Sequence, residues 1–147
     1  MTEVQELHSA VKRGDTVAMK ALLDRDRALA NSVSATDPRH TYPLHVAAEF
    51  GQADAARMLL AYGADPTLLD AENDAIALGW AAFFGRPGVV AVLLEAGSEP
   101  SQRNKHGLTP LGCALGGTEG RWHQFSNATI EDWQAAADAI RKSGGTE

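Results

Sequence analysis

Short runs of apolar residues at helical spacing alternate along this chain with glycine-containing breaks. Between Tyr42 and Asp65, leucines and alanines lie three and four positions apart in two consecutive runs, which places them on one face of each of two short helices. Pro43 suits the first turn of the first helix, and Gly51 and Gly63 follow the two runs as stop signals. The pattern predicts a helix, a tight turn and a second helix. Because neither helix can bury its apolar face alone, this unit needs neighbours on both sides.

The neighbouring units can be located because leucine and alanine recur at nearly fixed spacings along the chain. Four leucines, spaced 37, 34 and 33 residues apart, occupy one slot: Leu7, Leu44, Leu78 and Leu111. Alanines fill the next slot, at Ala10, Ala47, Ala81 and Ala114. The stretch Tyr-Pro-Leu-His-Val-Ala that begins at Tyr42, repeated at about 33 residues, resembles the ankyrin repeat. The resemblance covers roughly residues 2–143 and is strongest over 42–65.

The resemblance implies an all-α fold, an ankyrin-repeat solenoid of stacked helix–turn–helix pairs with projecting fingers. We expect one domain, residues 1–147, in four parts. Residues 1–37 form an amino-terminal capping repeat, 38–72 and 73–105 form two full repeats, and 106–147 form a carboxy-terminal repeat. In this last repeat a second helix does not follow the first directly, which indicates an insertion between the two helices at about residues 116–128.

The family also indicates which residues face the concave surface, namely the finger tips and exposed positions of each first helix. On the helices these positions are Val46, Glu49, Phe50, Trp80, Phe83, Phe84, Cys113, Gly116 and Gly117. Three large aromatics on one helix beside small groups on the next predict an apolar recess. The alternative is that Trp80 and one phenylalanine belong to the core between repeats, while the insertion covers the other phenylalanine.

The insertion begins with glycines and continues with aromatics, Trp122 and Phe125. A flexible start followed by apolar anchors suits a segment that turns over the concave face. We therefore expect it to cover the recess as a lid or wall, with His123 directed inward and Arg121 directed to solvent or to an acidic ligand. The alternative is a disordered surface loop, because long insertions cost a repeat protein little.

Composition narrows the classes of partner. The net charge of −6 without a basic stripe argues against binding nucleic acid. The single cysteine, Cys113, forms no internal disulfide and belongs to no metal-ligand pattern. No apolar stretch approaches the length of a membrane span, and the amino terminus lacks the pattern of a signal peptide. We expect a soluble, cytoplasmic monomer that requires no cofactor or metal.

Two functions remain open, because no catalytic motif is present and the repeat pattern says little about function. The first is a protein-binding module that uses the concave face and fingers near residues 39–42, 70–73 and 103–106. The second is a binding site for an apolar small molecule, or an enzyme, with candidate acid–base groups Glu49, His106, Glu119 and His123. Either reading uses the same expected binding residues: Tyr42, Val46, Glu49, Phe50, Trp80, Phe83, Phe84, Cys113, Trp122, His123 and Phe125.

Overall fold

The chain forms a single row of helix pairs. The computed structural model describes residues 1–147 and contains α-helices and one 3-10 helix, without strands. The elements are α1 (Glu3–Arg13), α2 (Thr16–Arg25), η1 (Arg27–Asn31), α3 (Pro43–Phe50), α4 (Ala53–Ala61), α5 (Ala77–Phe83), α6 (Pro87–Glu95), α7 (Pro110–Thr118) and α8 (Ile130–Lys142). The predicted all-α stack of helix–turn–helix pairs is confirmed.

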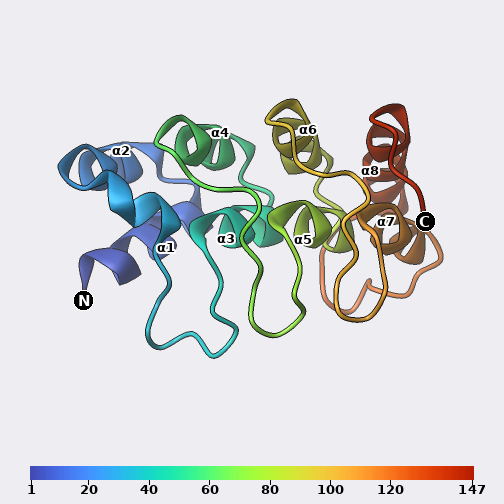
Figure 1. The fold of residues 1–147 in the computed structure, drawn as a ribbon, viewed down its shortest axis with the longest axis horizontal. Coiled ribbons are helices and arrows are strands. Elements are labelled where there is room, and N and C mark those ends of the chain that lie inside the picture. Colours follow the sequence, from blue (N-terminus) through green and yellow to red (C-terminus); the bar gives the residue numbers. More distant parts are fainter.

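The pairs stack so that like helices lie in like layers. Helices α1, α3, α5 and α7 form one layer, and α2, α4, α6 and α8 form the other, each in contact with its neighbour along the row (Figure 1). Three long loops, residues 32–42, 62–76 and 96–109, project on the side of the first layer and are called the fingers here. Their tips are joined by backbone hydrogen bonds of 2.9 Å from Ala71 N to the Arg39 carbonyl and from Lys105 N to the Asn73 carbonyl.

One continuous apolar core runs between the two layers. The leucine of each repeat slot is buried, from Leu7 in α1 to Leu111 in α7, and α8 closes the core with Trp133 and Ile140. Only nearest neighbours along the row share this core, so cohesion is distributed over the interfaces between pairs.

Hydrogen bonds between successive pairs repeat at one position. Gln52, at the start of α4, donates from Nε2 to the Lys12 carbonyl at 2.9 Å. In the next pair, Arg86 donates from Nε to the Glu49 carbonyl at 3.0 Å. Both acceptors lie two residues before the turn glycine of the preceding pair, where a helix end leaves carbonyls without an intrahelical partner. Each pair therefore caps the first helix of the pair before it.

Two segments differ from expectation. The connection after α2 contains the 3-10 helix η1, which the repeat pattern does not indicate. Helix α7 runs to Thr118, so Gly116 and Gly117, expected in the insertion, are helical. The helix ends where Gly120 adopts a left-handed φ of 80°, and the connection to α8 spans residues 119–129. A capping box formed by Thr129 and Asp132 begins α8.

Candidate functional site

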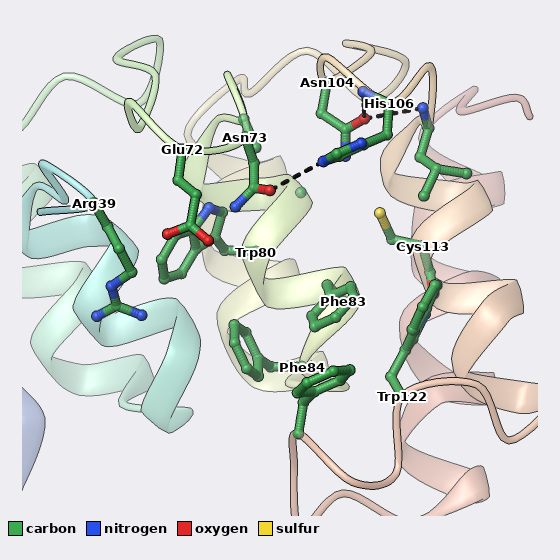
Figure 2. A pocket seen from close by; sticks show the side chains of 14 residues that line it. Arg39, Glu72, Asn73, Trp80, Phe83, Phe84, Asn104, His106, Cys113 and Trp122 are labelled. Carbon is green, nitrogen blue, oxygen red and sulfur yellow. Dashed lines mark hydrogen bonds between the residues drawn. The ribbon is translucent and has the colours of Figure 1, made fainter.

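A cavity of about 540 Å³ opens between the second and third fingers, α5, α7 and the 119–129 connection. We call it the recess (Figure 2). Its lining residues are Arg39, Glu72, Asn73, Ala75, Gly79, Trp80, Phe83, Phe84, Asn104, His106, Leu108, Cys113, Trp122 and Phe125. Aromatic rings form its lower wall, and polar finger residues form its upper rim.

The aromatic wall is centred on Phe83. Its ring centroid lies 4.7 Å from that of Trp122, 5.1 Å from that of Phe84 and 5.9 Å from that of Phe125. These separations are those of favourable aromatic pairs. Trp80 is buried, in agreement with the alternative that placed it in the core between repeats. Phe83 and Phe84 are half-buried, and Phe125 is 58% exposed. The wall therefore combines core rings with rings that face solvent.

Trp122 is held in one orientation. Its indole N–H donates to the Cys113 carbonyl at 2.8 Å, and the ring lies against Gly116 so closely that a Cβ there would be 2.6 Å from Nε1. A side chain at residue 116 would displace the indole. The small residues of α7 thus provide the space that seats this ring beside the α5 aromatics.

The 119–129 connection is fixed to α5 and α6 by polar contacts. Ser126 Oγ donates to the Phe84 carbonyl at 2.7 Å, and Arg86 Nη1 donates to Asn127 Oδ1, also at 2.7 Å. Arg86 thereby serves two neighbours, since its Nε caps α3. These bonds and the ring contacts place the connection as a wall of the recess and leave its upper side open.

A buried carboxylate, Asp70, shapes the second finger. It is 1% exposed and accepts hydrogen bonds from the backbone N–H groups of Glu72, Asn73 and Ala75 and from the Trp80 indole N–H at 3.1 Å. The sequence analysis placed it at a finger tip as a contact residue. An aspartate that starts a turn is the available sequence signal for this structural role.

Arg39 lies at the Trp80 end of the recess. Its guanidinium carbon is 5.1 Å from the Trp80 ring centroid, a cation–π geometry. The same guanidinium lies 3.5 Å from Asp37 and 3.3 Å from Glu49. Burial alone would raise the pKa of Asp37, but hydrogen bonds from Thr41 and backbone N–H groups, with the Arg39 charge, lower it to about 2. Arg39 therefore faces the carboxylates of Asp37 and Glu49, and that of Asp37 is ionised at neutral pH.

His45 occupies the position that the family resemblance assigns to framework hydrogen bonding. Its Nε2 donates to the Ala75 carbonyl at 2.8 Å, and its Nδ1 accepts from the Tyr42 backbone N–H at 3.2 Å. Burial lowers the pKa of His45 from its ordinary value. The ring also packs edge-on against Trp80, so this neutral histidine supports the recess from behind.

The four candidate acid–base groups are not gathered at one point. Glu49 pairs with Arg39, and His106 donates to Asn73 Oδ1 at 3.2 Å on the rim. Glu119 is exposed and pairs with Arg121 at 3.0 Å. His123, expected to point inward, is exposed and does not line the recess, because its Nδ1 is turned to the carbonyl of Gly120 within the same tight turn.

Other expected binding residues lie outside the recess. Val46 is buried in the core, Tyr42 is half-buried, and Phe50 is exposed beneath Lys12 Nζ at 5.0 Å. Cys113 does line the recess but is 2% exposed, and burial raises the pKa of its thiol to about 12. The thiol stays protonated near neutral pH, which makes it a poor nucleophile.

No group of three or more His, Cys, Asp or Glu side chains is arranged to hold a metal ion. None of the helices combines the length and apolar character needed to cross a bilayer. The site thus consists of apolar rings with a hydrogen-bonding rim.

Comparisons with known proteins agree with the stacked architecture. Residues 5–70 match the family model described as ankyrin repeats (3 copies). A putative ankyrin repeat-containing protein of Treponema pallidum is 36% identical over 85 residues, 58% of this chain and 28% of that protein. The E3 ubiquitin-protein ligase KEG of Arabidopsis thaliana is 44% identical over 59 residues, 40% of this chain and 4% of that protein. Both matches therefore span far less than two thirds of the relatives.

The family match ends before α5, so the aromatic helix, α7 and the 119–129 connection lie beyond it. Those parts nevertheless continue the same row of helix pairs, with α5 packed on α3 and α7 packed on α5. Residues 5–70 thus match ankyrin repeats, and the helix pairs beyond them continue the stacked architecture to α8.

Proposed function

We propose that this protein is an interaction module that binds a segment of another protein in the recess, with the fingers contacting the residues on either side. The observation that supports this most directly is the set of solvent-facing rings beside the open cavity, Phe83, Phe84 and Phe125. Ankyrin repeats are in general protein-interaction modules. We therefore expect the partner to bind the concave face and the fingers.

The energetics of interfaces favour such a site. Binding energy is concentrated in a few bulky side chains that enter well-packed pockets and exclude water. The recess offers apolar walls to such a side chain, and the hydrogen-bonded positions of Trp122 and Trp80 reduce the ordering cost of binding. The linked finger tips likewise present the rim as one surface.

The enzymatic alternative receives less support from the geometry. A general base must lie within hydrogen-bonding reach of the group it serves and near its acid partner. Glu119 and His123 do not line the recess, and the remaining candidates, Glu49 and His106, are engaged with Arg39 and Asn73. A small apolar ligand would fit the volume but would leave the polar finger tips without a role.

The test is a selection of random dodecapeptides displayed on phage against the immobilised chain. Binders should lose affinity at least tenfold toward Phe125→Ala, because the change removes an exposed ring from the wall without opening the core. The matched control is Phe50→Ala, which removes another exposed ring outside the recess and should leave binding unchanged. Peptides that bind Phe125→Ala as well as the unmodified chain would overturn the proposal.

A further inference from the structure

The charges around the recess define the chemistry of its occupant. We infer, on the basis of the proposed function, that the bound segment carries a lysine or arginine close to its apolar anchor, and that Glu72 receives this cation. The apolar side chain then occupies the end formed by Phe83 and Trp122.

Glu72 is the charged lining residue without a partner. Two lining residues are charged, Arg39 and Glu72. Arg39 is matched by Asp37 and Glu49, whereas the Glu72 carboxylate is exposed and makes no hydrogen bond or ion pair. Its backbone N–H, in contrast, is fixed on the Asp70 carboxylate at 3.1 Å. The main chain thus holds a free carboxylate at the rim.

The end of the recess formed by Trp80 favours a cation. Figure 2 shows Glu72 and Arg39 at the same end of the recess as Trp80, opposite Trp122. The Trp80 ring already has the Arg39 guanidinium at cation–π distance. Two carboxylates, Asp37 and Glu49, pair with that guanidinium, and the Glu72 carboxylate lines the same end without an ion pair. The balance at this end is negative, so a second cation lowers the local repulsion.

The opposite end is lined by no carboxylate, lysine or arginine. There the rim consists of Asn104, His106 and Leu108 above the rings of Phe83 and Trp122. The Asn104 side chain is occupied by the backbone N–H groups of His106 and Leu108. No carboxylate at this end attracts a cation, and the apolar wall suits an aromatic or large aliphatic side chain. The recess therefore orients a segment that has a cation at one end and an apolar group at the other.

An acidic segment fits this arrangement poorly. A carboxylate entering at the Trp80 end would meet Glu72 and would have to separate Arg39 from Asp37 or Glu49. The net charge of −6 also steers cationic rather than anionic partners toward the chain.

The same phage selection tests this inference with three variants. Dodecapeptides selected on the unmodified chain should be enriched in lysine or arginine close to an aromatic or large aliphatic residue. One such peptide, synthesised with a fluorescent label, should bind Glu72→Gln about 2- to 5-fold more weakly, an effect that salt reduces because the pair is exposed. Selection on Glu72→Lys should instead enrich aspartate or glutamate. Asp74→Asn, in the same finger but outside the lining, is the matched control and should bind normally.

The outcomes separate this inference from the proposed function. Peptides that depend on Phe125 but show no basic enrichment, with equal affinity for Glu72→Gln, would overturn the inference and leave the binding site in place. Peptides insensitive to Phe125→Ala, or a selection without binders, would count against both.

Discussion

The indole N–H of Trp133 donates a 3.0 Å hydrogen bond to the carbonyl of Phe83, fifty residues earlier in the chain. This carbonyl lies two residues before Gly85, the position that Gln52 and Arg86 serve in the preceding pairs. In the last pair a tryptophan from α8 takes over this role. Helix α8 is thereby joined to the end of the helix that carries the recess aromatics.

Removing that donor should destabilise the last two helix pairs. Trp133→Phe keeps most of the buried ring but leaves the Phe83 carbonyl without its partner, at a cost of about 1–3 kcal/mol in the free energy of unfolding. Urea titration followed by circular dichroism measures the change. Gln134→Ala, at an exposed position of the same helix, should stay within about 0.5 kcal/mol of the unmodified chain. A Trp133→Phe variant as stable as that control would contradict the capping role.

The glycines of α7 should respond differently to the same substitution. A Cβ at Gly117 would lie 2.1 Å from the Trp133 ring, so Gly117→Ala should cost about 1–3 kcal/mol or more. Gly112, in the same helix, has its nearest neighbours at 3.5 Å. Gly112→Ala should therefore stabilise the protein by about 0.5–1 kcal/mol, because alanine is the better helix former. Melting temperatures that move in the same direction would show that the packing is misassigned.

Cys113 should report on the seating of Trp122. The thiol is buried and its pKa is raised to about 12, so its reaction with a disulfide reagent at neutral pH should be far slower in the folded protein than in urea. Gly116→Ala should speed the reaction of the folded protein, since it displaces the indole that lies across the Cys113 carbonyl. An unchanged rate would mean that the indole stays in place.

Stability should fall in mild acid because of the buried His45 and the half-buried His8. Burial lowers the pKa of both His45 and His8 below the ordinary 6.5, so the unfolded chain binds more protons as the pH falls through that value. A proton on His45 Nδ1 would also face the Tyr42 N–H that this nitrogen now accepts. The urea midpoint should drop between about pH 7 and pH 5, before the pKa window of Asp37, about 2 to 3.8, is reached.

Nuclear magnetic resonance gives the matching local measurement. The ring protons of His45 should titrate below 6.5 in the folded protein. Titration at or above that value, or a urea midpoint that rises in acid, would refute the assignment of a neutral framework histidine.

The 119–129 connection should behave as an ordered segment. The backbone N–H groups of Arg121 and Phe125 donate to the carbonyls of Gly116 and Trp122 at 3.0 and 2.9 Å. Their amide hydrogens should exchange with solvent more slowly than those of a free chain. Exchange at free-chain rates would instead support the disordered-loop alternative.

The helix pairs could be predicted from sequence because periodicity determines which face of a helix is buried. Leu44, Leu78 and Leu111 share a slot, and each is buried as that slot requires. The grouping of Trp80, Phe83 and Phe84 on one helix likewise indicated where rings gather. These features depend on positions that recur in every repeat, so a substitution in one repeat does not hide the pattern.

Side-chain direction within single turns could not be predicted in the same way. The His123 ring is directed to the Gly120 carbonyl, and the Asp70 carboxylate is directed inward to accept from backbone N–H groups. Both orientations are set by the local geometry of a turn, which does not repeat along the chain. The start of the insertion was predicted too early, at about residue 116, although the concave-face spacing also placed Gly116 and Gly117 on a helix. The rings of Trp122 and Trp133, which lie against these two glycines, cannot be inferred from the repeat pattern.

The positions of the tryptophans have a spectroscopic consequence. All three, Trp80, Trp122 and Trp133, belong to the last two helix pairs or the connection within them, and none lies in α1 to α4. Tryptophan fluorescence therefore reports on the carboxy-terminal half and on the part of α3 that packs against Trp80, whereas circular dichroism sums over every helix. If the α1–α2 pair opens first, the dichroic signal will decline while the tryptophan emission spectrum stays unchanged, and the two unfolding curves will not coincide.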